Sequence, residues 1–332
     1  MSKAKVAVLG ASGAVGREMI NVLVERGMRT DEIVALGGKS AGKSIDAGDN
    51  RIEIFSAEKF DFSRVKYVLG AVSAELSRKY SPKILSGGAV YIDNSSAFRL
   101  DDGVPLVVPG INDDDALLHR GIIANPNCST IIALTALAGI NRISQINEVI
   151  AVTYQAVSGA GAEGMTELRA QTEALLRGEE TVCRVFPHRI AENVIPWIGS
   201  KSEGGYTDEE MKMQNEGRKI FGRDNVTFNC TCVRVPVMRS HSIALSVFCD
   251  RSLNVREVKD AVRQTKRCLL FDDIERGEYP MPMLSSGRDE VFVGRIRNTP
   301  EGRGGIALFC CGDQLRRGAA TNAVDIMELV EK

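Results

Sequence analysis

The chain begins with short apolar runs separated by amphipathic stretches, a pattern that predicts buried strands alternating with helices. The runs stand in the stretches "KVAVLG", "EIVALGG", "VKYVLGAV", "AVYIDNSS" and "GIIANPNC". Helices are expected directly after the first run and at 74–86. Near-continuous apolar strands that alternate with helices are typical of a parallel sheet covered on both faces. We therefore predict a doubly wound, parallel α/β domain.

The second half of the chain has a different pattern, because apolar and polar residues alternate with period two. The stretches "FNCTCVRVPV", "SIALSVFCD", "VFVGRIR" and "GIALFCCGD" show it most clearly. This alternation predicts a mainly antiparallel sheet with one covered face, and hence an α+β domain. The last stretch, "QLRRGAATNAVDIMELVEK", predicts a helix that docks on the first domain. The predicted domains are 1–128 with 313–332, and 129–312.

A glycine-rich turn joins the first strand to its helix in "KVAVLGASGAVGREM". Gly10 allows a tight turn, Gly13 allows close approach of a phosphate, and Gly16 allows the helix to pack on the strand. A pyrophosphate would then lie at the helix N-terminus. The spacing, G-x-x-G-x-x-G, is not the commoner one, and a turn without a ligand is the alternative. Its place between a strand and a helix favours a Rossmann-type dinucleotide site.

The end of the second strand indicates which nicotinamide cofactor this domain would bind. A site for NAD has an acidic residue there to hold the ribose 2′-hydroxyl. This chain has Lys39, Ser40 and Lys43 instead, and Asp31 and Glu32 stand at the other end of the strand. A cation and a hydroxyl suit a 2′-phosphate, so NADP(H) is predicted over NAD. The alternative is that the lysines are solvated loop charges.

Composition narrows the class of protein. The 332 residues include 42 basic and 43 acidic ones, so no basic field favours nucleic acid or a membrane surface as a partner. No apolar run approaches the roughly 20 residues of a membrane span. Eight cysteines without a signal-peptide pattern predict reduced thiols in the cytoplasm. With only three histidines and no C-x-x-C pair, no metal site is expected.

One cysteine stands outside the apolar runs. In "NPNCST", Cys128 follows a turn and precedes a helix, at the carboxyl end of a predicted strand. The helix dipole and the unpaired N–H groups at such a position lower the pKa of a thiol and favour its reactivity. The alternative is a small residue fitted into a tight turn. His241, between two serines, is a candidate acid–base partner, and His188 competes for that role.

Charged residues near other strand ends are candidates for substrate contacts. Arg99 follows one strand of the first domain, and Arg234 stands in a strand of the second. Glu209 and Lys212 share a face of a helix that is expected to be exposed, at 207–222. The alternative for these last two is a solvated surface pair.

Together, these motifs resemble those of the aspartate-β-semialdehyde dehydrogenase family over essentially the whole chain. The stretches concerned are "GASGAVG", "KSAGK", "NSSAFR", "NPNCST", "TYQAVSGAG", "EEMK", "VRVPVMRSH" and "GAATNAV". Members of the family reduce β-aspartyl phosphate to aspartate semialdehyde with NADPH and release phosphate. The reaction lies on the route to lysine (through diaminopimelate), threonine and methionine. The resemblance also implies a homodimer, formed mainly by the second domain.

The resemblance implies a role for each candidate residue. Cys128 would form a thioester with the acyl group, His241 would act as the acid–base residue, and Gln155 would orient the acyl group. Four residues would bind substrate: Arg234 its carboxylate, Glu209 its amine, and Arg99 and Lys212 its phosphate. The cofactor would contact Ser12, Gly13, Ala14 and Val15 at its pyrophosphate, and Ser158, Gly159 and Asn322 near its nicotinamide. His188 would then be structural.

One departure from the family and two rival functions remain. Many bacterial members have arginine where this chain has Lys39, so discrimination for the 2′-phosphate is expected to be weaker. One rival is an acyl-phosphate reductase for another substrate, such as N-acetylglutamyl phosphate. Glu209 together with Arg234 favours a substrate with a free amine and carboxylate. The other rival, a non-catalytic nucleotide-binding relative, is disfavoured because Cys128 and His241 are both present.

Overall fold

The computed structural model describes residues 5–300 and 304–331. Residues 1–4 of the predicted first domain, 301–303 of the predicted second domain, and Lys332 of the predicted terminal helix therefore lie outside the described residues. The chain divides into two compact units, Met1–Asn127 with Ala319–Lys332, and Cys128–Gly318. The predicted boundaries, after residues 128 and 312, differ from this division at Cys128 and at 313–318, which belong to unit 2.

Unit 1 contains a seven-stranded sheet in the order β3-β4-β2-β1-β5-β6-β7. All of its pairings are parallel except that of β3 with β4. The strands are β1 (Val6–Leu9), β2 (Ile33–Gly37), β3 (Ser44–Ala47), β4 (Asn50–Ser56), β5 (Tyr67–Gly70), β6 (Val90–Asp93) and β7 (Ile122–Ala124). Strand order reverses between β1 and β5, as in doubly wound folds whose ligands bind beyond the carboxyl ends of the strands.

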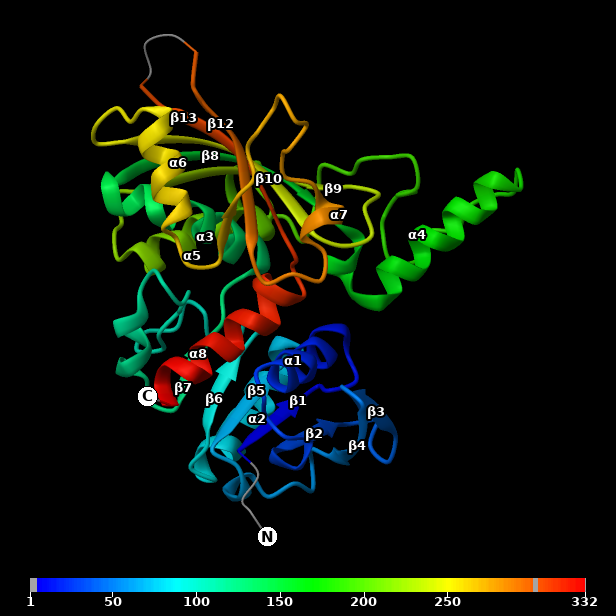
Figure 1. Cartoon of the computed structure of the whole chain (residues 1–332). Helices are drawn as coiled ribbons and strands as arrows, with labels where there is room; N and C mark the ends of the chain where they lie inside the picture. Colours follow the sequence, from blue (N-terminus) through cyan, green and yellow to red (C-terminus); the bar gives the residue numbers. More distant parts are fainter. Residues whose placement is uncertain (1–4, 301–303, 332) are drawn as a thin grey trace. The chain divides into compact units, whose positions relative to one another are not determined.

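Helices cover both faces of this sheet (Figure 1). On one face α1 (Ala14–Glu25) and α8 (Thr321–Glu331) pack together, and buried Met19, Leu23 and Ile326 belong to one apolar cluster. On the other face lies α2 (Ala74–Ser86), in a second cluster. The terminal helix thus packs in unit 1, as its apolar stripe predicts.

Unit 2 contains a six-stranded sheet in the order β11-β12-β13-β10-β8-β9. The central pairings are antiparallel, whereas β8 with β9 and β11 with β12 are parallel. The strands are β8 (Ile146–Gln155), β9 (Thr227–Arg234), β10 (His241–Cys249), β11 (Cys268–Leu270), β12 (Val291–Asn298) and β13 (Ile306–Gly312). The sheet is mostly antiparallel, as predicted.

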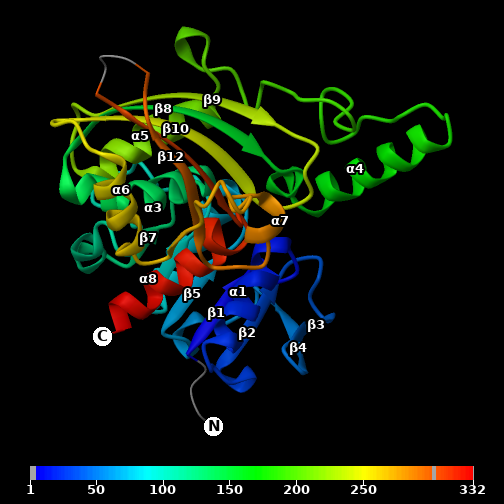
Figure 2. The ribbon, with the colours of Figure 1, turned by 45° about the horizontal axis from the view of Figure 1, so that its top comes forward.

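Three helices lie on one face of this second sheet (Figure 2): α3 (Cys128–Ile143), α5 (Asp208–Phe221) and α6 (Val255–Arg263). A fourth, α4 (Gly161–Leu176), projects from the body of unit 2, and a long loop returns from its end. A short helix, α7 (Pro282–Ser285), precedes β12. Among the described residues, no helix is both long enough and apolar enough to cross a membrane.

The structure corrects one expectation and adds elements that the pattern did not reveal. The helix at 207–222 was expected to be exposed, but α5 packs on β9 and buries Met213 and Ile220. Its charged residues concealed this apolar face. Strands β3 and β4 are not among the predicted strands, although β4 alternates charged and apolar residues in "RIEI" and buries Ile54. The alternation is short, and most of the strand is exposed. Helix α4 begins at Gly161, inside the stretch that was expected to be a turn.

The glycines of the β1–α1 turn give a first test. A Cβ atom at Gly16 would lie 2.3 Å from the Gly10 carbonyl oxygen, so Gly16→Ala must displace helix or turn. A Cβ at Gly13 would meet the same oxygen at 3.4 Å, an ordinary contact. We expect Gly16→Ala to lower the free energy of unfolding by about 1–3 kcal/mol, while Gly13→Ala changes it by less than about 1 kcal/mol. Equal denaturation midpoints for the two variants would contradict this packing.

Candidate active site

The β1–α1 turn of unit 1 has the geometry of a phosphate-binding loop. Gly10 has φ +89°, in the left-handed region, and a Cβ there would meet the backbone of Ala71. Gly13 is the N-cap of α1 and no side chain caps the helix. Ala14 and Val15 follow it in the first turn. The N–H groups at this helix start can therefore receive an anion, and the residues present fit a dinucleotide pyrophosphate.

The end of β2 lies beside this turn. The Ser12 hydroxyl donates a hydrogen bond to Ser40 Oγ at 3.0 Å, so the two loops are held together. Lys39 is an exposed neighbour of Ser40. Asp31 and Glu32 lie in a 3₁₀ turn that precedes β2, at its amino end. The two acidic residues near β2 therefore stand at the end of the strand away from the β1–α1 turn.

Arg99 and Asn322, both expected in the site, belong to a buried network in unit 1. Arg99 donates from Nε to the Asn125 carbonyl oxygen at 3.0 Å and from Nη2 to the Asn94 carbonyl oxygen at 2.8 Å. Asn322 donates to Asn125 Oδ1 at 2.6 Å and to the Val107 carbonyl oxygen at 3.0 Å. Asn322 Oδ1 is buried and has no hydrogen-bond partner among the described residues. The network fixes the loop before Cys128.

In unit 2, three predicted site residues lie at one end of the sheet, where three neighbouring strands begin or terminate. Gln155 ends β8 and is in register with Arg234 at the end of β9. His241 begins β10, and its neighbour Ser242 is in register with Tyr154 of β8. Because β8 is parallel to β9 and antiparallel to β10, the last residues of β8 and β9 and the first residue of β10 lie at the same end of the sheet. All three side chains are buried.

The backbone of Ala156 holds two of these side chains. Its N–H donates to His241 Nδ1 at 3.1 Å, and its carbonyl oxygen accepts from Arg234 Nη1 at 2.7 Å. Since Nδ1 accepts a hydrogen bond, a neutral His241 ring carries its proton on Nε2. Nε2 is buried without a hydrogen-bond partner among the described residues, and so presents an unused N–H donor.

Burial sets the charge state of the histidine. Desolvation, together with the nearby positive charge of Arg234, lowers the pKa of His241 to about 3, against a small opposing effect of Glu209. Desolvation also lowers the pKa of Arg234, opposed by the charges of Glu209 and Cys128. The histidine is therefore neutral at physiological pH, and the arginine keeps its charge.

Cys128 is the first residue of α3 and is partly exposed. Its charge interacts with Arg234, and because this interaction is mutual, the guanidinium favours the thiolate. Gly318 packs against it, since a Cβ there would lie 2.9 Å from Cys128 Cβ. By contrast, burial raises the pKa of Cys268 and of Cys311 to about 12. Of these three thiols, Cys128 is the one whose surroundings favour reactivity.

Ser158 and Gly159 lie next to the same side chains. A Cβ at Gly159 would meet Arg234 Nη1 at 2.7 Å and His241 Nε2 at 3.3 Å, so only glycine fits here without displacement. The Ser158 hydroxyl accepts a hydrogen bond from Gln314. Gln314 also accepts from the N–H of Ser240, a residue with φ +74°. Gln314 was not predicted, and nothing in its local sequence pattern indicates this role.

Glu209 and Lys212 form a pair that contacts this end of the sheet through Gln155. Gln155 Nε2 donates to Glu209 Oε1 at 3.3 Å, and Lys212 Nζ lies 3.0 Å from Glu209 Oε2. The side chains are 10% and 28% exposed, so this is not a solvated surface pair. His188, the competing histidine, is exposed on the loop that follows α4. Unit 2 thus brings together seven predicted site residues at one end of its sheet: Gln155, Ser158, Gly159, Glu209, Lys212, Arg234 and His241.

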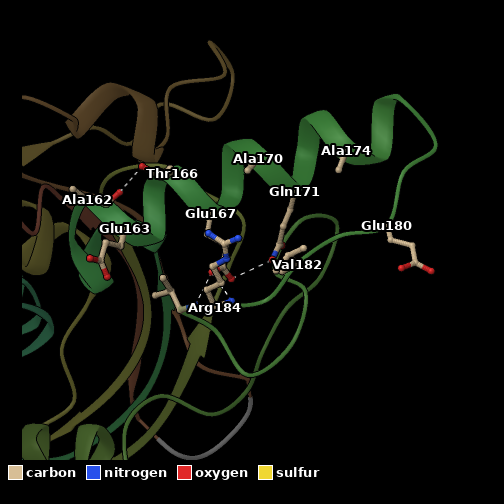
Figure 3. Close-up of a pocket in the computed structure, with 11 residues that line it drawn as sticks. Ala162, Glu163, Thr166, Glu167, Ala170, Gln171, Ala174, Glu180, Val182 and Arg184 are labelled. Atoms are coloured by element: carbon tan, nitrogen blue, oxygen red, sulfur yellow. Dashed lines mark hydrogen bonds between the residues drawn. The ribbon is translucent and has the colours of Figure 1, made fainter.

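A pocket of about 630 Å³ lies elsewhere in unit 2, along α4 (Figure 3). Two buried polar residues that line it hydrogen-bond to the loop that follows α4. Glu167 accepts hydrogen bonds from the N–H groups of 184–186, and Gln171 accepts from those of 190 and 191. None of the predicted site residues lines this pocket. Its contacts fix the loop that brings the Phe186 ring to 5.9 Å from the guanidinium of Arg234.

Comparison with known proteins decides the family. Residues 5–119 match the family model "Semialdehyde dehydrogenase, NAD binding domain", and residues 137–317 match "Semialdehyde dehydrogenase, dimerisation domain". An aspartate-semialdehyde dehydrogenase of Aquifex aeolicus is 41% identical over 99% of this chain and 98% of its own. One of Bacillus subtilis is 40% identical over 98% and 97%.

The chain belongs to the aspartate-semialdehyde dehydrogenase family. The fold agrees with this: aspartate semialdehyde dehydrogenase II of Vibrio cholerae, solved complexed with ASA, superposes with a TM-score of 0.96. It is 40% identical and covers 100% of this chain and 99% of its own.

As a member of this family, the chain is a nicotinamide-dependent oxidoreductase of amino-acid biosynthesis, and its second unit matches the family's dimerisation domain. The predicted family, two-part fold class and enzyme activity are confirmed. The relatives' names favour aspartate over the N-acetylglutamyl substrate and the non-catalytic alternative.

Burial of His241 predicts a pH dependence of stability. The histidine pKa is about 3 in the folded enzyme against 6.5 for the free group. Below pH 6.5 the unfolded chain takes up a proton on this histidine that the folded chain does not. The free energy of unfolding therefore decreases as the pH is lowered from 6.5 toward 3, by up to about 1.4 kcal/mol per pH unit. His241→Asn keeps an acceptor for Ala156 without this titration. We expect its unfolding free energy, measured in urea from pH 7 to 4, to fall less steeply than that of wild type. Parallel curves would exclude a buried neutral histidine.

Proposed function

We propose that this enzyme reduces L-4-aspartyl phosphate to L-aspartate 4-semialdehyde and phosphate, reversibly, through a thioester on Cys128. The observation that carries the proposal is the grouping of a thiol at a helix start, a buried arginine and a neutral histidine. An acyl phosphate that also carries a carboxylate needs a nucleophile, a donor for the oxyanion that forms at its acyl carbon, and a cation for the carboxylate. Unit 2 contains one residue suited to each task.

Cys128 acts as the nucleophile. As a thiolate, its sulfur attacks the acyl carbon, the bond to the phosphate oxygen breaks, and phosphate leaves with the bonding electrons. NADPH, when bound, supplies the hydride that reduces the acyl carbon. Cys128 then leaves as a thiolate and the aldehyde forms. The N-terminus of α3 and the charge of Arg234 favour the thiolate both in the first step, when it attacks, and in the last step, when it leaves.

His241 supplies the donor. With Nδ1 turned to the Ala156 N–H, its Nε2–H is available to the acyl oxygen as that oxygen becomes negative. Donation from a neutral ring stabilises an oxyanion without a change of charge on the protein. This refines the acid–base role implied by the resemblance. Uptake of a proton from the thiol at Nε2 would require the other tautomer, and hence loss of the Ala156 contact.

The remaining site residues hold the substrate. Arg234 pairs with its carboxylate, a match for a guanidinium fork, and Glu209 receives its amine. Gln155, already bonded to Glu209, orients the acyl group. Lys212 and Arg99 supply positive charge for the phosphate. A free amine and a free carboxylate thus have separate partners, which disfavours an N-acetylated substrate.

The cofactor is proposed to be NADP(H). The turn at Gly10, Ser12, Gly13, Ala14 and Val15 would hold its pyrophosphate. Lys39 and Ser40 would contact the 2′-phosphate, and Ser158, Gly159 and Asn322 would lie by the nicotinamide. Because Lys39 is a point charge on a flexible stem, some use of NAD is expected.

The active form is proposed to be a homodimer, built through the open face of the sheet in unit 2. Figure 2 shows α3, α5 and α6 on one face of this sheet. Tyr154 of β8 is 39% exposed and, because side chains alternate along a strand, lies on the face opposite to buried Thr153 and Gln155. Phe309 of β13 lies beside it, with ring centroids 6.3 Å apart. An open sheet face that carries aromatic side chains is suited to a second copy of the chain.

The enzyme is proposed to work in the cytoplasm. All eight cysteines are free thiols in the structure. The sulfur atoms of Cys230 and Cys232 lie 3.7 Å apart and share a hydrogen bond rather than a disulfide. Free thiols in such proximity suit a reducing compartment.

The function is tested by following nicotinamide absorbance while the enzyme meets aspartate semialdehyde, phosphate and NADP⁺. Reduction that needs all three supports the acyl-phosphate route. Cys128→Ser is expected to lower kcat by about 10³-fold or more, since a neutral hydroxyl is a far weaker nucleophile. Cys183→Ser, which alters an exposed thiol, is the matched control and keeps wild-type rates. Activity retained in Cys128→Ser would exclude the thioester.

Lys39 is tested by reversal of its charge. Lys39→Glu places a carboxylate where the 2′-phosphate is proposed to bind, so repulsion is expected to lower kcat/KM for NADP⁺ by about tenfold or more. The same value for NAD⁺ is expected to stay within about threefold, because NAD⁺ lacks that phosphate. A parallel fall for both cofactors would remove Lys39 from the 2′-phosphate site.

A further inference from the structure

Helix α5 covers the free edge of strand β9. This strand is the last in the order of its sheet and pairs with β8 on its inner side. On the outer side, an edge strand has backbone N–H and C=O groups that need other partners. Here side chains of α5 supply part of them.

Three residues of α5, spaced by one turn, face the edge of β9. The contacts are Glu210 with the N–H of Cys232, Gln214 with the N–H of Phe228 and the carbonyl of Val226, and Arg218 with the same carbonyl. Helix and strand approach closely at this point, because a Cβ at Gly217 would meet the Phe228 ring at 2.6 Å. The contacts therefore fix the position of α5 along β9.

Glu210 differs from the other two because it contacts both β9 and the residue that caps α5. Oε2 accepts from the Thr207 N–H at 2.8 Å, and Thr207 Oγ1 accepts from the Glu210 N–H, so the pair caps the start of α5. Oε1 accepts from the Cys232 N–H at 3.0 Å. The residue is only 8% exposed. One buried carboxylate thus determines both where α5 begins and where that first turn sits on β9.

The two segments that Glu210 joins carry the proposed substrate ligands. Glu209 precedes it on α5, and Arg234 follows Cys232 by two residues, on the same face of β9. Glu209 contacts Gln155, which is in register with Arg234. The spacing between the proposed amine and carboxylate partners therefore depends on the contact between α5 and β9.

We propose that Glu210 is a positioning residue for substrate recognition, which holds Glu209 at the correct distance from Arg234. The inference rests on the roles proposed above for those two residues. A carboxylate suits the task because it accepts two hydrogen bonds in different directions, whereas an amide has one acceptor oxygen. Discrimination for the amine of aspartate semialdehyde is thus set by a residue that does not touch the substrate.

The test is Glu210→Gln, assayed with aspartate semialdehyde and with 4-oxobutanoate, the same aldehyde without the amine. One of two buried N–H groups loses its acceptor, and Glu209 shifts. Because small misplacements are costly, we expect KM for aspartate semialdehyde to rise about tenfold and its preference over 4-oxobutanoate to fall about tenfold. KM for NADP⁺ stays within about twofold and the pH profile of kcat is unchanged, since these report other groups.

Two controls separate positioning from stability. Gln214→Glu disturbs the next contact along the same edge, by replacing the donor to the Val226 carbonyl. Glu257→Gln alters the equivalent capping-box glutamate of α6, a helix that carries none of the proposed site residues. Both are expected to lower the thermal midpoint and to leave the amine preference within about twofold of wild type, since neither residue adjoins Glu209.

The outcomes are distinct. A folded Glu210→Gln enzyme with wild-type amine preference overturns the inference, as does an equal loss of preference in either control. Glu209→Gln tests the underlying assignment, because an unchanged preference there means that the proposed role of Glu209 itself is wrong. If Glu210→Gln does not fold, Thr207→Ala loosens the same turn from the other side. It is expected to reduce the preference about threefold, and no reduction overturns the inference.

Discussion

The arrangement of the site in unit 2 depends on two hydrogen bonds made by the backbone of Ala156. This residue follows the end of β8, and its N–H and carbonyl groups hold His241 and Arg234 respectively. Because backbone atoms at the end of a central strand cannot move independently of the sheet, a neutral donor and a fixed cation are held at a constant separation. The tautomer of the histidine follows from the same contact.

Burial gives these contacts their strength and also makes them costly. Desolvation lowers the pKa of both His241 and Arg234, and the arginine charge persists because it has acidic neighbours and a carbonyl partner. A buried cation without such partners would destabilise the fold. Glycine at position 159 lets the backbone approach both side chains, and Gln314 fixes the adjacent segments. Among the described residues, Nε2 of His241 is a fully buried atom of this group without a hydrogen-bond partner, and it is the atom that is proposed to face the substrate.

The sequence predicted the parts of the molecule whose pattern is local. The helix at 74–86 and the β1–α1 turn depend on periodicity and on glycines a few residues apart, so they could be identified directly. Strand β4 carries only a short alternation, "RIEI", and α5 carries enough charge to hide its packed face. The hydrophobic pattern was therefore too short to single out β4 and was masked by charged residues in α5. Gln314 and Glu210 act through contacts with residues distant in the sequence or on another element, and only the fold brings these together.

Coverage of the β9 edge has a consequence for solubility. An uncovered edge strand can pair with a strand of another molecule, and this is a common route to aggregation. Glu210, proposed to position a substrate ligand, and its neighbour Gln214 both occupy backbone N–H groups of β9 that such pairing would use. A substitution that retunes recognition by loosening α5 would thereby expose a surface prone to self-association. Substitutions that change specificity through α5 are therefore limited by the need to keep the protein soluble.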